Sequence, residues 1–408
     1  MIITNIKVKT VLLAMISVLY VLWGTSWDMP IISLPPSYFL IAAFLCCIIF
    51  LPQQPIMREK IIPLMLFAGI FLLNTPFSLS AIYSSNDISR DLDYLVNYDF
   101  KIFLNLLLLF GVVKIFNTKE DFKKFSFLLS LTICILAPLL IWRYIFVFDV
   151  LYVGVELSEP RREGKNSFAM AMILIFPFLL MNLKEKKLYK YFSVFAALFV
   201  VTLAILINSR SAIIVLFLIS MMYLFFAEFK GKKMLLFFSM PIILIILSTF
   251  SILEFLTKTG SFSDGLNSNE TVSLSILTES HRGYLAREAI EGSIENIGFP
   301  HGTATFRIRP TNQGSRTETH NDHLLILYEQ GFIGLLLMWF IFFDGIYFSF
   351  KKYKKYKDSI SLATFLSLVA LFIGMFFINI LQTLIFWLFF GMSLCLENIN
   401  KHSGQERQ

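Results

Sequence analysis

Long apolar stretches recur along the whole chain and limit its possible folds more than any other feature. They run for about 16–25 residues each, the length that crosses a hydrocarbon core as an α-helix. With 57% hydrophobic and 15% charged residues, the chain is too apolar for a soluble globular protein. The apolar runs are continuous rather than alternating, which favours helices over a β-barrel. The sequence therefore predicts an all-α polytopic membrane protein with about twelve transmembrane helices.

The expected spans can be placed along the sequence to within a few residues. They are 10–25, 31–52, 61–81, 100–116, 125–148, 166–182, 191–207, 211–228, 234–254, 332–349, 359–377 and 380–396. A tight break at Asn379 and Gln382 is all that separates the last two. Lys7 and Lys9 precede the first span as in a signal peptide, but no small-residue cleavage site follows, so we expect this helix to be retained.

Lysines gather in alternate connections between the spans and predict the orientation of the chain. Lysine groups occur within 114–124, 184–190, 230–233 and 351–357, whereas four aspartates, Asp87, Asp91, Asp93 and Asp99, fall in the connection between the third and fourth spans. Basic residues favour the cytoplasmic side of a membrane. Both termini are therefore expected in the cytoplasm.

One outer connection, 255–331, is far longer than the others and divides the chain. Residues 1–254 would hold the first nine helices, 255–331 a large outer loop, and 332–408 the last three helices and a cytoplasmic tail. The loop contains four of the five histidines: His281, His301, His320 and His323. Apolar residues at helical spacing within 280–298 predict an amphipathic helix that lies on the bundle or on the headgroup layer.

The stretch "THNDHLLILYEQGFIG" has the pattern of a helix that stands above the membrane before a span begins. Thr319 or Asn321 is suited to cap this helix, and Gly331 and Gly334 would begin the span itself. Small residues three apart allow a neighbouring helix to approach closely. His320 would then lie at the entrance of a helix, at the outer edge of the membrane.

Most arginines fall on the outer side, where the positive-inside rule does not call for them. The planar guanidinium binds phosphate through two hydrogen bonds and stays charged, so such a face suits a phosphorylated ligand. The alternative is that individual arginines pair with the acidic outer residues or anchor a helix at the lipid surface. The arginines concerned are Arg161, Arg162, Arg210, Arg282, Arg287, Arg307, Arg309 and Arg316.

Several common types of site are missing from the sequence. It has no CxxC pair, P-loop, GxGxxG or nucleotide-sugar motif, which excludes an ATP-driven pump and a cytosolic nucleotide-sugar transferase. The four cysteines fall within expected spans and form no disulfide framework. His320 and His323 could share a metal, but a third ligand at useful spacing is lacking, so we expect none.

Three motifs together resemble those of the bacterial O-antigen ligase family. His320-Asn321, nine residues, Gly331, two residues and Gly334 match the H[NSQ]-x9-G-x2-[GTY] signature of that family. "INSRSAIIVL" places Arg210 between two spans, and "SHRGYLAREAIEGSIENIGF" places Arg282 in the helix of the large loop, as the family does. The resemblance covers about 200 to 350. "EPRREGKNSFAMAM" is similar to a stretch that ligases share with the related polymerases.

This resemblance implies a GT-C type bundle in the bacterial inner membrane with its active site on the periplasmic side. Such an enzyme moves O-antigen polysaccharide from undecaprenyl diphosphate to a sugar hydroxyl of lipid A-core, without metal, nucleotide or other cofactor. His320 would be the catalytic base, and Arg210 and Arg282 would hold the diphosphate. Arg161, Arg162, Arg287 and Asn321 are expected to bind substrate. Partners would be the two lipid-linked glycans and membrane lipids, not nucleic acid.

Two alternatives remain open at this stage. An O-antigen or exopolysaccharide polymerase of the same superfamily would use a second lipid-linked repeat as acceptor, and the sequence favours the ligase only through the histidine signature. A flippase or transporter would carry ionisable residues at mid-bilayer depth. The spans here are nearly free of them, which favours an enzyme.

Overall fold

The structure is a computed structural model that describes residues 2–23, 44, 58–83, 85, 87–142, 162–184, 187–207, 209–226, 281–308 and 319–405. Regular structure in these residues is entirely helical, as the apolar runs predict. In chain order the elements are α1 (Ile2–Trp23), α3 (Arg58–Tyr83), α4 (Ile88–Ile115), α5 (Lys119–Trp142), α6 (Arg162–Leu174), α7 (Phe176–Met181), η3 (Asn182–Lys184), α8 (Lys187–Leu206), α9 (Arg210–Phe226), α13 (His281–Glu295), α14 (Thr305–Ile308), α15 (Asp322–Tyr356), α16 (Ser359–Gly374) and α17 (Leu384–Gln405).

The expected spans overlap the helices wherever the structure describes them, although several bounds differ. Two expected spans, 31–52 and 234–254, lie outside the described residues apart from Phe44. Each of the others overlaps a helix. Four helices are long and apolar enough to cross a membrane, Ile62–Tyr83, Ile88–Ile115, Lys187–Ile205 and Asp322–Tyr356, and five shorter apolar helices accompany them. The total of about twelve stays a prediction.

Local sequence signals explain where several helices begin and end. α4 begins at Ile88 because Asp87 caps it, its carboxylate accepting the Arg90 N–H. The expected span began only at 100, so the prediction that Asp91, Asp93 and Asp99 lie in a connection was wrong: all three are on α4. The span expected at 166–182 breaks between α6 and α7, where Pro177 occupies the start of α7.

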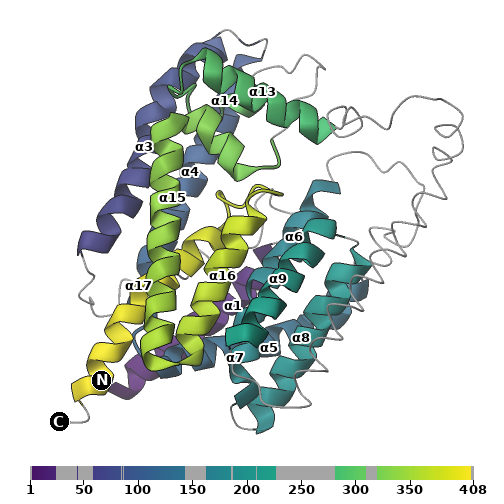
Figure 1. Ribbon diagram of the computed structural model, residues 1–408, viewed down its shortest axis with the longest axis vertical. Helices are drawn as coiled ribbons and strands as arrows, with labels where there is room; N and C mark the ends of the chain where they lie inside the picture. Colours follow the sequence, from purple (N-terminus) through teal and green to yellow (C-terminus); the bar gives the residue numbers. More distant parts are fainter. Residues whose placement is uncertain are drawn as a thin grey trace, which may run out of the picture.

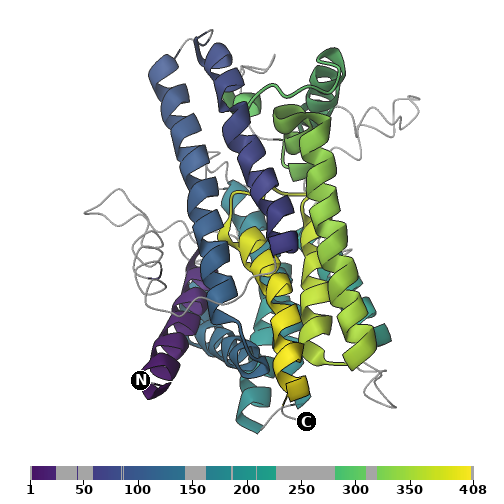
Figure 2. The ribbon, with the colours of Figure 1, turned by 90° about the vertical axis from the view of Figure 1, so that its left-hand side faces the viewer.

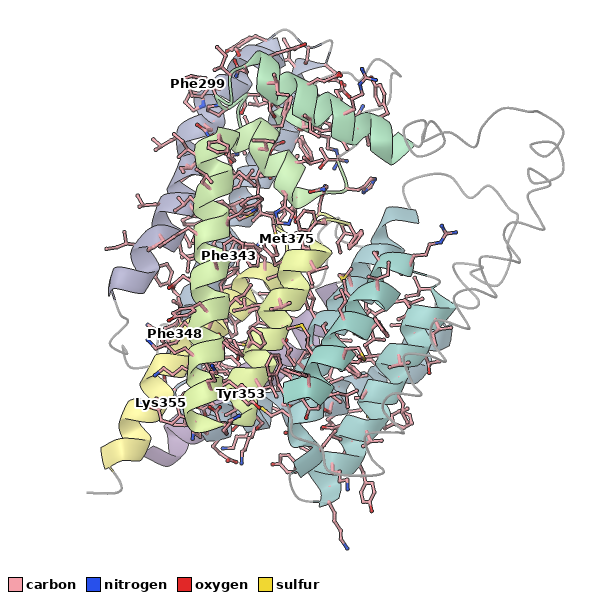
Figure 3. All side chains as sticks on the ribbon, viewed as in Figure 1. Phe299, Phe343, Phe348, Tyr353, Lys355 and Met375 are labelled. Carbon is pink, nitrogen blue, oxygen red and sulfur yellow. The ribbon has the colours of Figure 1, made fainter. Side chains whose placement is uncertain are left out.

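Both ends of the described chain lie at one end of the bundle, the lysine end, at the bottom of Figure 1. There Lys9 Nζ lies 3.7 Å from Asp121, which joins the start of α1 to that of α5. Tyr353 donates to the Phe226 carbonyl and so joins the lysine-rich end of α15 to the end of α9. Figure 3 places Lys355 at this end too. One end thus collects lysine-rich connections, as the predicted topology requires.

The opposite end, the α13 end, carries α13 and α14 at the top of Figure 1. α3 and α4 run side by side up to it (Figure 2). Ser78 of α3 donates to the Thr303 carbonyl over 2.6 Å, and Thr303 Oγ1 donates to the Phe71 carbonyl over 2.8 Å. The segment before α14 is therefore fastened to the end of α3.

α15 folds back on itself at Gly331, which has φ 71° and ψ −174°. Sixteen residues of straight helix would hold His323 and Trp339 about 24 Å apart. Instead the Trp339 indole N–H donates to His323 Nδ1 over 3.2 Å. Residues 322–330 therefore rise toward the α13 end, and residues 332–356 descend through the bundle. The sequence placed the boundary correctly but did not predict the reversal.

Gly331 serves a different contact from the one that the sequence predicted. A Cβ there would lie 2.6 Å from the Gly298 carbonyl oxygen and 3.0 Å from the Pro300 nitrogen. At Gly334 it would meet side chains of the folded-back part of α15, Gln330 first. The close approach of a helix predicted from these glycines is therefore present at Gly334, where the neighbour is the other part of α15, whereas Gly331 admits the turn that follows α13.

α13 is the helix expected within the outer loop, and it covers the folded-back part of α15. Leu285 and Ala289 are fully buried and form a small core with Phe306, Leu325 and Tyr328. The opposite apolar residues, among them Ile294, stay exposed. This agrees with the expectation of a helix on the bundle.

Candidate active site

The backbone before α15 is held in an unusual conformation at His320. This residue has φ 52°, in the left-handed region, where few residues other than glycine are found. Thr319 is buried, and its hydroxyl donates to the Asn321 carbonyl over 2.8 Å and accepts the Asn321 N–H over 3.2 Å. Such conformations cost of order 1–3 kcal/mol and persist where the surroundings enforce them, frequently at active sites.

Asn321 is the N-cap of α15, one of the two residues that the sequence favoured for this role. Its side-chain oxygen accepts the His323 and Leu324 N–H groups over 3.0 and 3.1 Å. The cap and the Thr319 hydrogen bonds fix the backbone on both sides of His320. The half-buried His320 side chain therefore starts from a defined position.

Asp322 joins this helix start to the break between α16 and α17. Its Oδ2 accepts the Ile380 and Leu381 N–H groups over 2.5 and 2.9 Å, and its own N–H donates to the Met375 carbonyl over 2.9 Å. The carboxylate is 1% exposed. Charged hydrogen bonds of this kind are worth roughly 1.5–3 kcal/mol each. Met375 lies midway up the molecule in Figure 3, and its hydrogen bond with Asp322 places the start of α15 beside it.

α6 and α9 also begin on the side of the bundle away from the lysine end. Met170, in the third turn of α6, is the nearest neighbour of a Cβ built on Gly374, at 3.2 Å. Gly374 immediately precedes Met375, which contacts Asp322. The Tyr223 hydroxyl, near the end of α9, donates to the Leu180 carbonyl of α7, so α9 starts at the opposite end. Arg210, its first residue, is exposed there.

His323 and His301, the two other histidines of this region with described side chains, are held by hydrogen bonds and ring contacts. Trp339 donates to Nδ1 of His323, so Nε2 carries the proton that His323 donates to the Phe372 carbonyl over 3.1 Å. Both nitrogens of His323 are thus used, and it is 4% exposed. His301 stacks on Tyr328 with ring centroids 4.1 Å apart, and its Nε2 lies 2.9 Å from the Gly292 carbonyl oxygen.

The structure describes the predicted arginines to different extents. Arg282 lies in the first turn of α13, on the same helical stripe as the buried Leu285 and Ala289 by its spacing of three and seven residues. Arg162 is the first residue of α6. The side chains of these two arginines, and all of Arg161, lie outside the described residues.

Arg287 is exposed and has a partner on its own helix. Its Nε donates to Glu291 over 2.7 Å, and this hydrogen bond raises the pKa of the guanidinium above its ordinary value. An ion pair with an acidic outer residue was the alternative that the sequence left open for the outer arginines. The geometry favours that alternative here.

Asp322 and the buried break at 375–383 were not identified as parts of the site from the sequence. The break was noticed at Asn379 and Gln382, and Asp322 lies inside the histidine signature. Nothing local shows that these two segments touch, because 58 residues separate Asp322 from Ile380.

Comparison with known families agrees with this region of the structure. Residues 195–339 match the family model described as O-antigen ligase. No curated protein matches the chain significantly. The matched region runs from α8 to Trp339, the residue that holds His323 in the fold-back, and it contains Arg210, Arg282 and His320. The resemblance to the O-antigen ligase family indicated by the three motifs is thereby confirmed over residues 195–339.

Proposed function

We propose that this membrane protein is an O-antigen ligase that transfers polysaccharide from undecaprenyl diphosphate to a sugar hydroxyl of lipid A-core, on the periplasmic face of the inner membrane. The observation that carries the proposal is the site at the start of α15. A histidine in a strained backbone conformation lies there, beside a capped helix whose first residue is bound to the break between α16 and α17.

In this mechanism His320 takes the proton of the acceptor hydroxyl. The hydroxyl oxygen attacks the anomeric carbon of the donor, and the bond from that carbon to the diphosphate breaks, so the configuration inverts. Undecaprenyl diphosphate leaves as an anion. An imidazole is suited to the task because it titrates near neutral pH, and a positioned base contributes about 10²–10⁴-fold to a rate.

Arg210 and Arg282 hold the diphosphate in this proposal. Both are the first or second residue of a helix, whose unpaired N–H groups favour an anion as well. Each charged hydrogen bond is worth roughly 1.5–3 kcal/mol, and it stabilises the charge that develops on the leaving group. Since the arginines supply the positive charge, we expect transfer to withstand chelators.

The other predicted substrate residues have lesser roles. Asn321 positions His320 through its helix cap rather than by binding substrate. Arg161 and Arg162 precede and begin α6 and remain candidates for the glycan or the lipid headgroup. Arg287 has no role in the proposal, because its guanidinium is engaged with Glu291.

The test is transfer in vitro from purified lipid-linked glycan to purified lipid A-core. His320→Gln keeps a hydrogen-bonding tip but cannot accept a proton, so turnover should fall about 10²-fold or more. His402→Gln, in α17 at the lysine end, is the matched control and should leave turnover unchanged. Near-normal turnover of His320→Gln, in correctly inserted protein, would show that another group is the base.

Arg210→Lys and Arg282→Lys test the diphosphate site separately. Lysine keeps the charge but loses the planar fork, so each change should lower turnover at least about tenfold. Arg58→Lys, at the first residue of α3, is the control. Full activity in both site variants at normal abundance would reduce these arginines to membrane anchors.

A polymerase would use the same donor, and a deletion strain distinguishes the two reactions. Loss of a ligase removes every lipopolysaccharide band that carries O-antigen. Loss of a polymerase leaves core that bears one repeat. A single-repeat band in the deletion strain would therefore replace the ligase proposal by the polymerase.

A further inference from the structure

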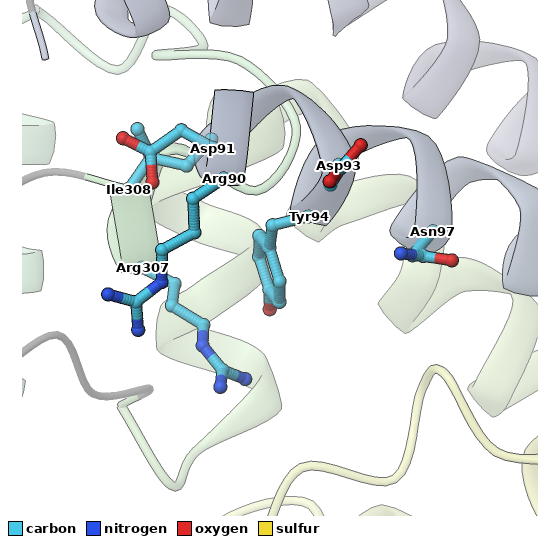
Figure 4. A pocket seen from close by; sticks show the side chains of 7 residues that line it. All are labelled: Arg90, Asp91, Asp93, Tyr94, Asn97, Arg307 and Ile308. Carbon is cyan, nitrogen blue, oxygen red and sulfur yellow. The ribbon is translucent and has the colours of Figure 1, made fainter. Parts of the chain in front are cut away.

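A cavity of about 230 Å³ opens between the first turns of α4 and the short helix α14, at the α13 end. Six of its seven lining residues have polar or charged side chains, although most of the surface that they turn toward the cavity is apolar. The residues are Arg90, Asp91, Asp93, Tyr94, Asn97, Arg307 and Ile308. Figure 4 shows Arg90 and Arg307 reaching from the two helices into the same space, with Tyr94 beside them. None of these residues belongs to the proposed transfer site.

The charges around the cavity cancel. Two guanidinium groups face a space that two carboxylates also line. A simple anion would be repelled by the carboxylates, and a simple cation would be repelled by the arginines. Neither ion can interact favourably with all the charged groups of the lining. A ligand that donates and accepts hydrogen bonds on adjacent atoms gains from both.

The donors on the α14 side are held in place. The Arg307 guanidinium lies over the Tyr94 ring, 4.6 Å from its centroid. Stacking of this kind orders the planar fork, so that less freedom is lost when a ligand binds. Asp91 is 3% exposed and fixed on α4 at the inner wall. Asp93 and Asn97 are exposed on the next turns of the same helix and can be replaced without disturbing the core.

We infer that this cavity is a saccharide subsite that binds one sugar residue of a glycan substrate. Sugar hydroxyls accept hydrogen bonds from guanidinium groups and donate to carboxylates and to the Asn97 amide oxygen. The volume agrees: at about 30 Å³ per liquid water, the cavity has room for about eight waters, or for a single hexose. The identity of the bound glycan rests on the proposed function. The binding of a sugar in this cavity does not depend on it.

Binding without turnover tests the inference directly. Saturation-transfer NMR would measure binding of the methyl glycosides of glucose, galactose and N-acetylglucosamine to the full-length protein in nanodiscs. At least one glycoside should receive saturation. The double variant Asp93→Asn/Asn97→Ala should weaken its binding about tenfold or more. Glu295→Gln removes an exposed carboxylate at the end of α13, outside the cavity lining, and should bind as the wild type does.

Two results would overturn the inference: no saturation transfer to any of the glycosides, or equal affinity in the double variant. Displacement of the bound glycoside by inorganic phosphate at similar concentration would also overturn it, in favour of an anion site. Phosphate without effect supports the saccharide.

Steady-state transfer then identifies which glycan occupies the subsite. In the double variant, a tenfold rise in KM for lipid A-core with kcat unchanged assigns the acceptor, and a rise in KM for the lipid-linked donor assigns the donor. An unchanged KM for both substrates would refute a role in glycan binding. His320→Gln should lose turnover yet keep glycoside binding, so failure of the transfer mechanism and failure of the subsite are distinguished.

Discussion

Gly331→Ala should break the fold-back that positions His320, and its cost can be worked out from the structure. Any side chain at φ 71° and ψ −174° is strained by about 1–3 kcal/mol. The new Cβ would lie 2.6 Å from the Gly298 carbonyl oxygen, an overlap that adds about 1–3 kcal/mol. If the turn moves away to relieve it, the 2.9 Å hydrogen bond from the Phe332 N–H to that carbonyl is lost, at about 1 kcal/mol.

Because the overlap and the lost hydrogen bond are alternatives, the total is about 2–6 kcal/mol of unfolding free energy. At roughly 2 °C for each kcal/mol, the melting temperature of the purified protein in detergent should fall by about 4–12 °C. Transfer should also decline in the protein that stays folded, because residues 322–330 begin at Asp322 and are capped by Asn321, next to His320.

Gly69→Ala is the matched control for this substitution. Gly69 lies within α3, and a Cβ there meets nothing within 4 Å. Alanine favours a helix by up to about 1 kcal/mol over glycine, so this variant should melt at or above the wild-type temperature. If Gly331→Ala melts together with Gly69→Ala and keeps full transfer, the fold-back at Gly331 is refuted.

His323→Ala should lower the unfolding free energy by about 2–4 kcal/mol, since it removes the hydrogen bond from Trp339 and leaves a cavity beside Phe372. Turnover per folded molecule should stay close to wild type, and a large loss would make His323 part of the chemistry. Asp322→Ala should destabilise by about 2–4 kcal/mol, because two buried N–H groups lose their acceptor, and Asp322→Asn by less because an acceptor oxygen remains. Equal melting temperatures for the two variants would show that the carboxylate does not hold the break. Reporter fusions after Lys190 and Lys357 should report the cytoplasm, and a fusion near Gly265 the periplasm. The opposite result would invert the topology and place the proposed site on the wrong side.

The chain's helical class and many helix positions could be predicted from the sequence. The length of an apolar stretch predicts a membrane span without knowledge of the rest of the chain. In lipid, each backbone N–H and C=O group must find its hydrogen-bond partner within the same helix. Caps are equally local: Asn321 was one of two expected caps, and its side chain accepts N–H groups only two and three residues away. The helix at 281–295 followed from its periodicity.

The candidate site residues were predicted from motifs, and their geometry was not predicted. The sequence grouped Arg210, Arg282 and His320 by resemblance alone. His323, only one turn from His320, could have been expected to share its chemistry, and its engagement with Trp339 and Phe372 required the fold-back. An unusual φ at His320 leaves no signal in residue type.

Only the tertiary structure shows which distant segments of the chain are in contact. A glycine in the sequence signals a possible break but does not say whether the next helix continues or reverses, because both use a flexible backbone. The reversal at Gly331 is stabilised by two long-range contacts. Gly331 packs against the turn at 298–300, and Asp322 accepts hydrogen bonds from the backbone of the break at 375–383. Likewise, Arg90 and Arg307 are more than 200 positions apart and share a cavity only because Thr303 fastens the segment before α14 to α3. Local propensities fix helices, but burial and hydrogen bonding between remote residues fix their direction and their neighbours.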